Sequence, residues 1–188
     1  MVNEDVSFYI KLAKTKQNFR KVKLVSKYTT GIVLFVIILE AMFFFLNNGE
    51  WDGMLPINIW PYFLFMGFNA FCYVYTKNKR VQVTKNNYKK IERFIGLYVF
   101  SLAGFGVIIS LADQSGYNHL MIYTLIMLVS CSYFVLNKIQ ILIPITIAGL
   151  VLVAGLYFFQ GNTAEFRSQL LYLMALFPVT YFLSRAFY

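Results

Sequence analysis

Two short polar stretches interrupt an otherwise apolar sequence, and they contain the residues best suited to chemistry. Glu40 lies in VIILEAMFFF, where a carboxylate is costly to bury and should therefore face protein or water. The stretch LADQSGYNHLMIY (111–123) concentrates polar side chains that could contact a ligand, namely Asp113, Gln114, Asn118 and His119, with Tyr123 one turn deeper. Carboxylate, amide and imidazole groups bind small polar ligands, protons or cations, so both stretches are candidate ligand sites.

Each of these residues also has a structural interpretation. Asp113 or Ser115 could cap the start of the next helix, and Glu40 could hydrogen bond to a neighbouring helix. A glutamine would serve that structural purpose at lower cost, which favours a ligand-binding role for Glu40. Asn69 is deeper in another apolar run and is expected to bond across helices.

The composition indicates an all-α membrane protein. Of the 188 residues, 59% are hydrophobic and 13% are charged, which is more apolar than a soluble domain requires. The apolar runs are long and continuous and do not alternate, so helices are favoured over a β-barrel. With two cysteines and one histidine, the sequence predicts no metal site, and no cofactor or catalytic motif is present.

Six apolar runs can each cross a hydrocarbon core, which takes about 20 residues. They cover Tyr28–Leu46, Pro56–Tyr75, Phe94–Ala112, Tyr117–Leu136, Ile139–Phe159 and Gln169–Phe187. All basic residues except Arg167 lie on one side of these spans, so the positive-inside rule predicts that both termini are cytoplasmic. Anionic lipid then explains the net charge of +9, and no nucleic acid partner is expected.

Residues 1–27 form a basic segment ahead of the transmembrane domain, which covers residues 28–188. Phe8, Leu12, Phe19 and Val22 share one helical face, which predicts a helix lying on the cytoplasmic surface of the membrane. Thr15 interrupts this stripe, and an unstructured leader is the alternative.

The remaining features concern a pocket and its possible motion. Trp60, Tyr62, Gln169 and Tyr172 could line the same outer vestibule as the two polar stretches, which predicts a pocket in the outer half of the bundle. Pro178 lies in the middle of the last span, where it predicts either two conformations or a fixed bend. Small residues predict that helices approach one another closely at Ala103, Gly106, Ser110, Ala148 and Gly155.

Three short motifs resemble the six-helix N-terminal membrane domain of diguanylate cyclases from Gram-positive bacteria. They are Asp113-Gln114, Tyr123 in the next helix, and the ending Ser184-Arg185 with Phe187-Tyr188. The resemblance implies a bacterial membrane sensor whose last helix leads through a coiled coil into a GGDEF catalytic domain that makes c-di-GMP. This chain has neither element, so no cyclase activity is carried over, and we expect it to be the membrane module of a longer receptor.

The preferred function is a sensory module that detects a small molecule or lipid and works as a homodimer. The signal is expected to leave through the last helix, with Pro178, Ser184, Arg185 and Tyr188 as output residues. The alternative is a small transporter or ion-coupled permease, with Glu40 and Asp113 as proton or cation sites. A membrane-embedded enzyme acting on lipid ranks last, because no catalytic constellation is evident.

Overall fold

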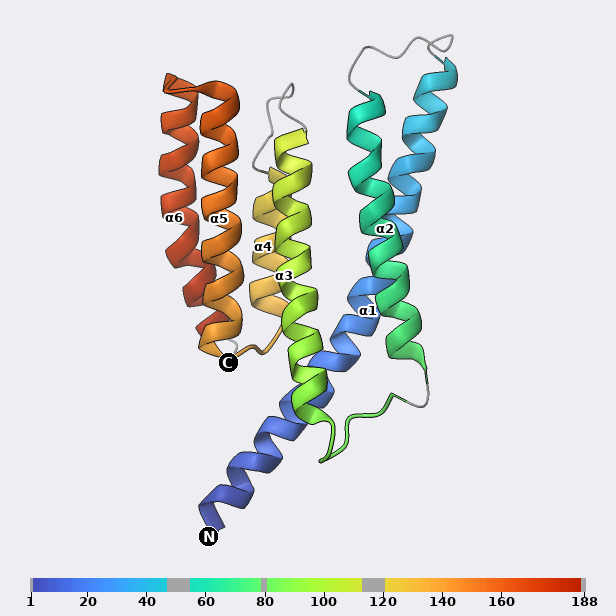
Figure 1. Cartoon of the computed structure of the whole chain (residues 1–188), viewed down its shortest axis with the longest axis vertical. Coiled ribbons are helices and arrows are strands. Elements are labelled where there is room, and N and C mark those ends of the chain that lie inside the picture. Colours follow the sequence, from blue (N-terminus) through green and yellow to red (C-terminus); the bar gives the residue numbers. More distant parts are fainter. Residues whose placement is uncertain (1, 47–54, 79–80, 113–120, 187–188) are drawn as a thin grey trace. The chain divides into compact units, whose positions relative to one another are not determined.

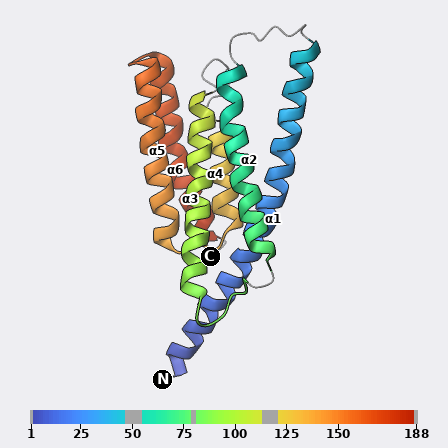
Figure 2. The same cartoon turned by 45° about the vertical axis from the view of Figure 1, so that its right-hand side comes forward.

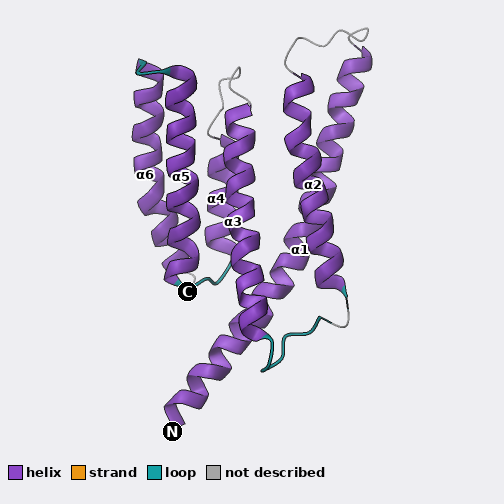
Figure 3. Cartoon of the chain, in the orientation of Figure 1, coloured by secondary structure: helices purple, strands orange, loops and turns teal. Residues whose placement is uncertain are grey.

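The computed structural model describes residues 2–46, 55–78, 81–112 and 121–186, with the side chains of 2–5, 40, 43–46, 55–59, 112, 121–122, 138 and 184 excepted. In these ranges every regular element is an α-helix (Figures 1 and 3). The helices are α1 (Val2–Leu46), α2 (Leu55–Lys77), α3 (Tyr88–Ala112), α4 (Met121–Tyr133), α5 (Lys138–Gln160) and α6 (Ala164–Ala186). The predicted all-α class is confirmed.

Within the described ranges, four stretches are long and apolar enough to cross a membrane. They are Val6–Leu39 in α1, Tyr88–Leu111 in α3, Ile139–Gln160 in α5 and Ala164–Leu183 in α6. The apolar part of α4, Tyr123–Tyr133, is shorter. Four apolar helices of this length are compatible with a multi-pass membrane protein.

Capping residues explain where the last two helices begin. Asn137 caps α5 through a reciprocal pair of bonds, in which its side chain accepts from the Gln140 N–H and its own N–H donates to Gln140 Oε1. The Thr163 hydroxyl accepts a bond of 3.1 Å from the Phe166 N–H at the start of α6. As a result α6 begins at Ala164 rather than at the expected Gln169.

The chain divides into two compact units that are contiguous in sequence, Met1–Tyr98 and Val99–Tyr188. The first unit contains α1, α2 and the first half of α3. The second unit contains the rest of α3 with α4, α5 and α6.

In the first unit, α1 is one continuous helix that passes residue 27 without a break, since no glycine or proline occurs before Gly31. Of its predicted apolar stripe, Leu12, Phe19 and Val22 are covered by protein. The Phe19 ring lies 6.5 Å from the Tyr75 ring of α2 and 6.4 Å from the Phe94 ring of α3, between centroids. Phe19 is consequently only 8% exposed.

Thr15 belongs to this buried stripe and does not interrupt it. Leu12, Thr15, Phe19, Val22 and Ser26 are all buried at alternating spacings of three and four residues, which is the pattern of a helix packed along a neighbour. The hydroxyl groups are satisfied within α1, because Thr15 donates to the Lys11 carbonyl (2.9 Å) and Ser26 to the Val22 carbonyl (2.7 Å).

In the second unit, α6 packs against α4 and α5, and α5 and α6 run side by side (Figures 1 and 2). Small residues allow close approach, as predicted. A Cβ at Gly106 of α3 would lie 3.4 Å from Ile126 Cδ1 of α4, and one at Gly155 of α5 would lie 2.6 Å from Leu111 Cδ1 of α3. Gly155 therefore leaves room for Leu111.

Candidate functional site

Most of the predicted polar pocket falls outside the described residues. Asp113, Gln114, Asn118 and His119 all lie there, and of Glu40 only the backbone, within α1, is described. Trp60 is 70% exposed on α2, with its ring 6.4 Å from that of Phe63. Trp60 and Tyr62 belong to the first unit, and Tyr123, Gln169 and Tyr172 belong to the second, so each is described within its own unit.

Tyr172 and Tyr123 lie at the contact between α4 and α6. The Tyr172 hydroxyl, on α6, donates a bond of 3.1 Å to Thr124 Oγ1 on α4. Tyr123 is one residue before Thr124 and is only 1% exposed, and its hydroxyl has no hydrogen-bond partner among the described residues. Two of the predicted ligand residues thus share one helix interface, and the buried hydroxyl of Tyr123 is not satisfied by any described residue.

The Tyr123 side chain borders a small void beside α6, too narrow for a water molecule. Its other walls come from α4, α5 and α6, and they are Met127, Ile145, Leu173, Leu176, Phe177 and Thr180. Because Ile145 and Phe177 also line a larger groove between α5 and α6, the void and that groove share walls.

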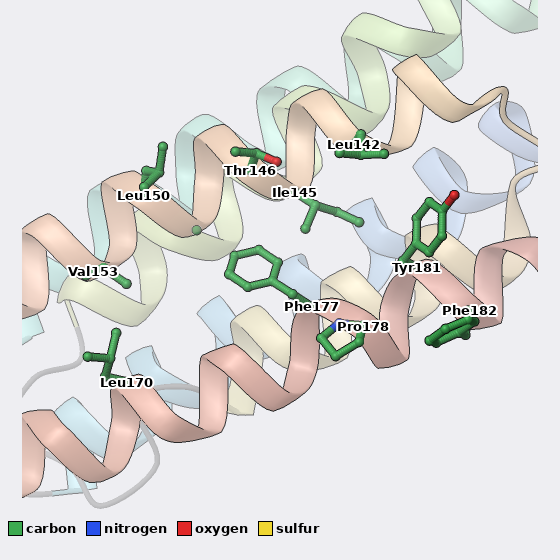
Figure 4. A pocket seen from close by; sticks show the side chains of 11 residues that line it. Leu142, Ile145, Thr146, Leu150, Val153, Leu170, Phe177, Pro178, Tyr181 and Phe182 are labelled. Carbon is green, nitrogen blue, oxygen red and sulfur yellow. The ribbon is translucent and has the colours of Figure 1, made fainter.

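The larger cavity has a volume of about 700 Å³ and opens between α5 and α6 (Figure 4). We call it the α5–α6 groove, and its walls are Leu142, Ile145, Thr146, Gly149, Leu150, Val153, Leu170, Phe177, Pro178, Tyr181 and Phe182. Its volume is typical of a small-molecule site. Unlike the polar pocket expected from the sequence, the groove is almost wholly apolar, so it suits a hydrocarbon chain rather than a polar ligand.

Gly149 shapes the groove by its lack of a side chain. A Cβ at this position would overlap the Phe177 ring, which lies directly against the glycine backbone. Phe177 consequently sits between α5 and α6, next to Pro178 on the groove wall (Figure 4). Phe177 directly precedes Pro178, so a ligand that contacts this ring lies against the segment of α6 that contains Pro178.

Pro178 and Thr180 together alter the hydrogen bonding of α6. Pro178 has no N–H to donate to the Met174 carbonyl, the acceptor four residues earlier. Thr180 Oγ1 lies 3.0 Å from the Leu176 carbonyl oxygen and 2.9 Å from that of Phe177, to which it can donate. Side-chain bonds of this kind often bend helices, so two adjacent features favour a bend here.

The sequence reasoning missed Thr180, Gly149 and the groove itself. A hydroxyl two residues after a proline, in PVT, is a local signal that could have identified Thr180. Gly149 was visible as a glycine within an apolar run, but its role depends on Phe177 of another helix. The groove has no counterpart in the sequence, because it arises from the fit of two helix faces.

At the end of α6, the Arg185 guanidinium lies 5.4 Å from the centre of the Tyr181 ring, within range of a cation–π contact. Ser184 lies in the same turn, with its side chain outside the described part, and Tyr188 lies outside it altogether. Of the predicted output residues, Pro178 and Arg185 are therefore the two whose side chains are described.

A polar contact inside the first unit confirms the prediction for Asn69. Tyr98 of α3 donates a bond of 2.9 Å to Asn69 Oδ1 of α2, and Asn69 Nδ2 donates 2.8 Å to the Phe65 carbonyl. Both side chains are almost completely buried. The bond joins α2 to α3 and has the character of a structural link rather than a ligand site.

No group of three histidine, cysteine, aspartate or glutamate side chains that could hold a metal ion occurs among the described residues. Over the described parts of the chain, the fold is α-helical with four helices long and apolar enough for a membrane, and an apolar cavity lies between two of them. No protein-family model, curated protein or solved structure matches the chain. Its function must therefore be inferred from these residues.

Proposed function

We propose that the chain is a transmembrane sensory module that binds an apolar or amphipathic ligand in the α5–α6 groove and passes the signal through α6. The observation that carries the proposal is the position of Pro178 on the groove wall. A ligand changes a conformation only by binding its two states with different affinity. A ligand in this groove contacts the segment of α6 that contains Pro178 directly, so its affinity depends on the shape of that segment.

The topology belongs to the same proposal. Six spans put both termini in the cytoplasm of a bacterial cell, and the distribution of basic residues supports this orientation. In that orientation the Arg185 end of α6 faces the cytoplasm, where an output domain can act.

The resemblance to diguanylate cyclase sensor domains supports a diguanylate cyclase as the proposed output domain. An attached catalytic domain of that class works as a pair, so a homodimer would convert a shift or rotation of α6 into a changed register of the two domains. The polar residues Glu40, Asp113, Gln114, Asn118 and His119 are proposed as a second ligand-contacting region at the outer side.

The proposal can be tested by fusing a diguanylate cyclase catalytic domain after residue 188. One inserted residue rotates the attached domain by about 100° around the helix axis, and seven residues nearly restore the phase. Insertions of one to seven residues at the junction should therefore give periodic cyclase activity, with recovery near four and seven. Cyclase activity that does not change across the insertion series would show that α6 does not transmit the signal.

A proline substitution provides a second measurement. Pro178→Leu restores the missing N–H and is expected to change the basal output by about fivefold or more, within the usual range of coupling between sites. Pro61→Leu, in α2, is the matched control and should leave the output unchanged. If the protein transports solute in proteoliposomes and Pro178→Leu leaves the cyclase activity of the fusion unchanged, a transporter is favoured instead.

A further inference from the structure

The α5–α6 groove opens to the surface of the second unit. Its rim is open, since Leu150 and Phe182 on its walls are 64% and 69% exposed. An empty space next to apolar side chains forfeits their dispersion contacts, so the groove favours apolar material that can enter from the side. The surrounding bilayer offers acyl chains for this purpose.

One end of the groove has a positive charge. Tyr181 and Phe182 belong to the groove wall, and the Arg185 guanidinium stacks over the Tyr181 ring at 5.4 Å. Lys138, the first residue of α5, starts the helix that runs antiparallel to α6, so its backbone is at the same end. No acidic residue occurs in 136–142 or 181–186, so this end suits a negative head group.

We propose that the groove binds an anionic phospholipid of the bilayer, with one acyl chain along Phe177 and Pro178 and the phosphate beside Arg185. The chain then lies where it can displace the Phe177 ring from Gly149. The proposal names the ligand of the sensory module, and in that respect it rests on the proposed function.

A second copy of the chain fits this groove less well than a lipid. An α-helix with its side chains is about 10 Å across, whereas an acyl chain is much thinner and can follow a narrow path between two helices. A second copy inserted with the same orientation would also bring its own Arg185 to the same membrane level, where like charges repel. A phosphate at that level is attracted.

The test uses the full chain in bilayers that contain phosphatidylglycerol or phosphatidylcholine with the same photoreactive acyl chain. Mass spectrometry then measures labelling of the groove walls, within 142–153 and 170–182. We expect phosphatidylglycerol to label these segments about fivefold more strongly, the preference given by one basic residue near the surface. Equal labelling by the two lipids would overturn the proposal.

Charge variants locate the head group. Arg185→Gln should abolish the preference for phosphatidylglycerol, and Arg185→Lys should retain it. Arg167→Gln is the matched control, because Arg167 lies at the opposite end of α6 and is exposed, with Nε donating 2.9 Å to Asn162 Oδ1. If Arg167→Gln reduces the preference as much as Arg185→Gln, the effect is one of overall charge and the specific site is refuted.

A cysteine at the groove rim tests for a second copy. Leu150→Cys should be labelled by lipid and should not form disulfide-linked dimers, while the native Cys72 and Cys131 are buried. Rapid dimer formation with no lipid labelling would assign the groove to a second copy. Lipid labelling requires no output domain, so the two proposals can fail separately. A preference for phosphatidylglycerol together with flat activity in the insertion series would support the lipid site and refute the sensory function. Periodic activity in the insertion series without a lipid preference would support the sensory function and refute the lipid site.

Discussion

Tyr98 and Tyr123 are both about 1% exposed, and their hydroxyl groups differ in hydrogen bonding. Tyr98 donates to Asn69, so Tyr98→Phe leaves the Asn69 carbonyl oxygen without this donor in an apolar setting. We expect the substitution to lower the free energy of unfolding by about 1 kcal/mol, which is typical of such bonds between membrane helices. Unfolding in mixed micelles measures this, and a double-mutant cycle with Asn69→Leu isolates the bond. Additive effects in that cycle would contradict the pairing.

Tyr123→Phe should behave in the opposite way. The Tyr123 hydroxyl has no partner among the described residues, so its removal relieves a desolvation cost and breaks no bond. We expect the free energy of unfolding to stay the same or to rise by about 1 kcal/mol in the same assay. A loss as large as that of Tyr98→Phe would mean that the hydroxyl is satisfied in the folded protein.

These two residues also mark how far a sequence can predict contacts. An amide within an apolar helix must find a partner, so the cross-helix bond of Asn69 was predictable. Its partner Tyr98 was not, because pairing depends on the register of α2 against α3. For Tyr123 the sequence indicated a special residue one turn below a polar stretch, but its contact with α6 requires the packing of two helices.

Helix α1 shows the same limit at the scale of an element. The all-α class was predictable from the apolar runs, because their length and continuity indicate helices that can enter a membrane. The burial of the stripe from Leu12 to Ser26 was not, since the polar Thr15 makes this packed face look interrupted in the sequence. The hydroxyl groups of Thr15 and Ser26 are satisfied inside the helix, which lowers the cost of burying them. The α5–α6 groove could not be predicted either, because a gap between two helices produces no residue pattern in the sequence.

The stripe of α1 can be tested by truncating Phe19. If α2 and α3 cover this ring, Phe19→Ala should lower the free energy of unfolding by about 3 kcal/mol, the cost of a cavity in a packed core. Ile10→Ala is the control, because Ile10 is 51% exposed on the same helix and should change little. If both variants lower the free energy of unfolding by the same small amount and Phe19→Ala weakens binding to membranes, the stripe lies on the lipid surface and is not packed against α2 and α3.

We predict the orientation of the whole molecule from the distribution of its charge. The connection between α2 and α3 contains Lys85 and is flanked by Lys77, Lys89 and Arg93, and by the positive-inside rule a basic connection is expected on the cytoplasmic side. A reporter that is active only in the cytoplasm should therefore work after residues 85 and 188 and fail after residue 50. Activity after residue 50 would show that the chain is inverted or that α1 does not cross the membrane.

The boundary between the two units lies inside α3, after Tyr98, and each unit is contiguous in sequence. A chain leaves the ribosome from its N-terminus, and contiguous units can fold in that order. The residue that donates to Asn69 is the last of its unit, so the first unit becomes complete only when the middle of α3 has been synthesised. Helices α5 and α6 are made later, so the groove between them forms only after α1 to α4 have been synthesised. A nascent chain therefore offers this groove to lipid later than it offers the surfaces of the first unit.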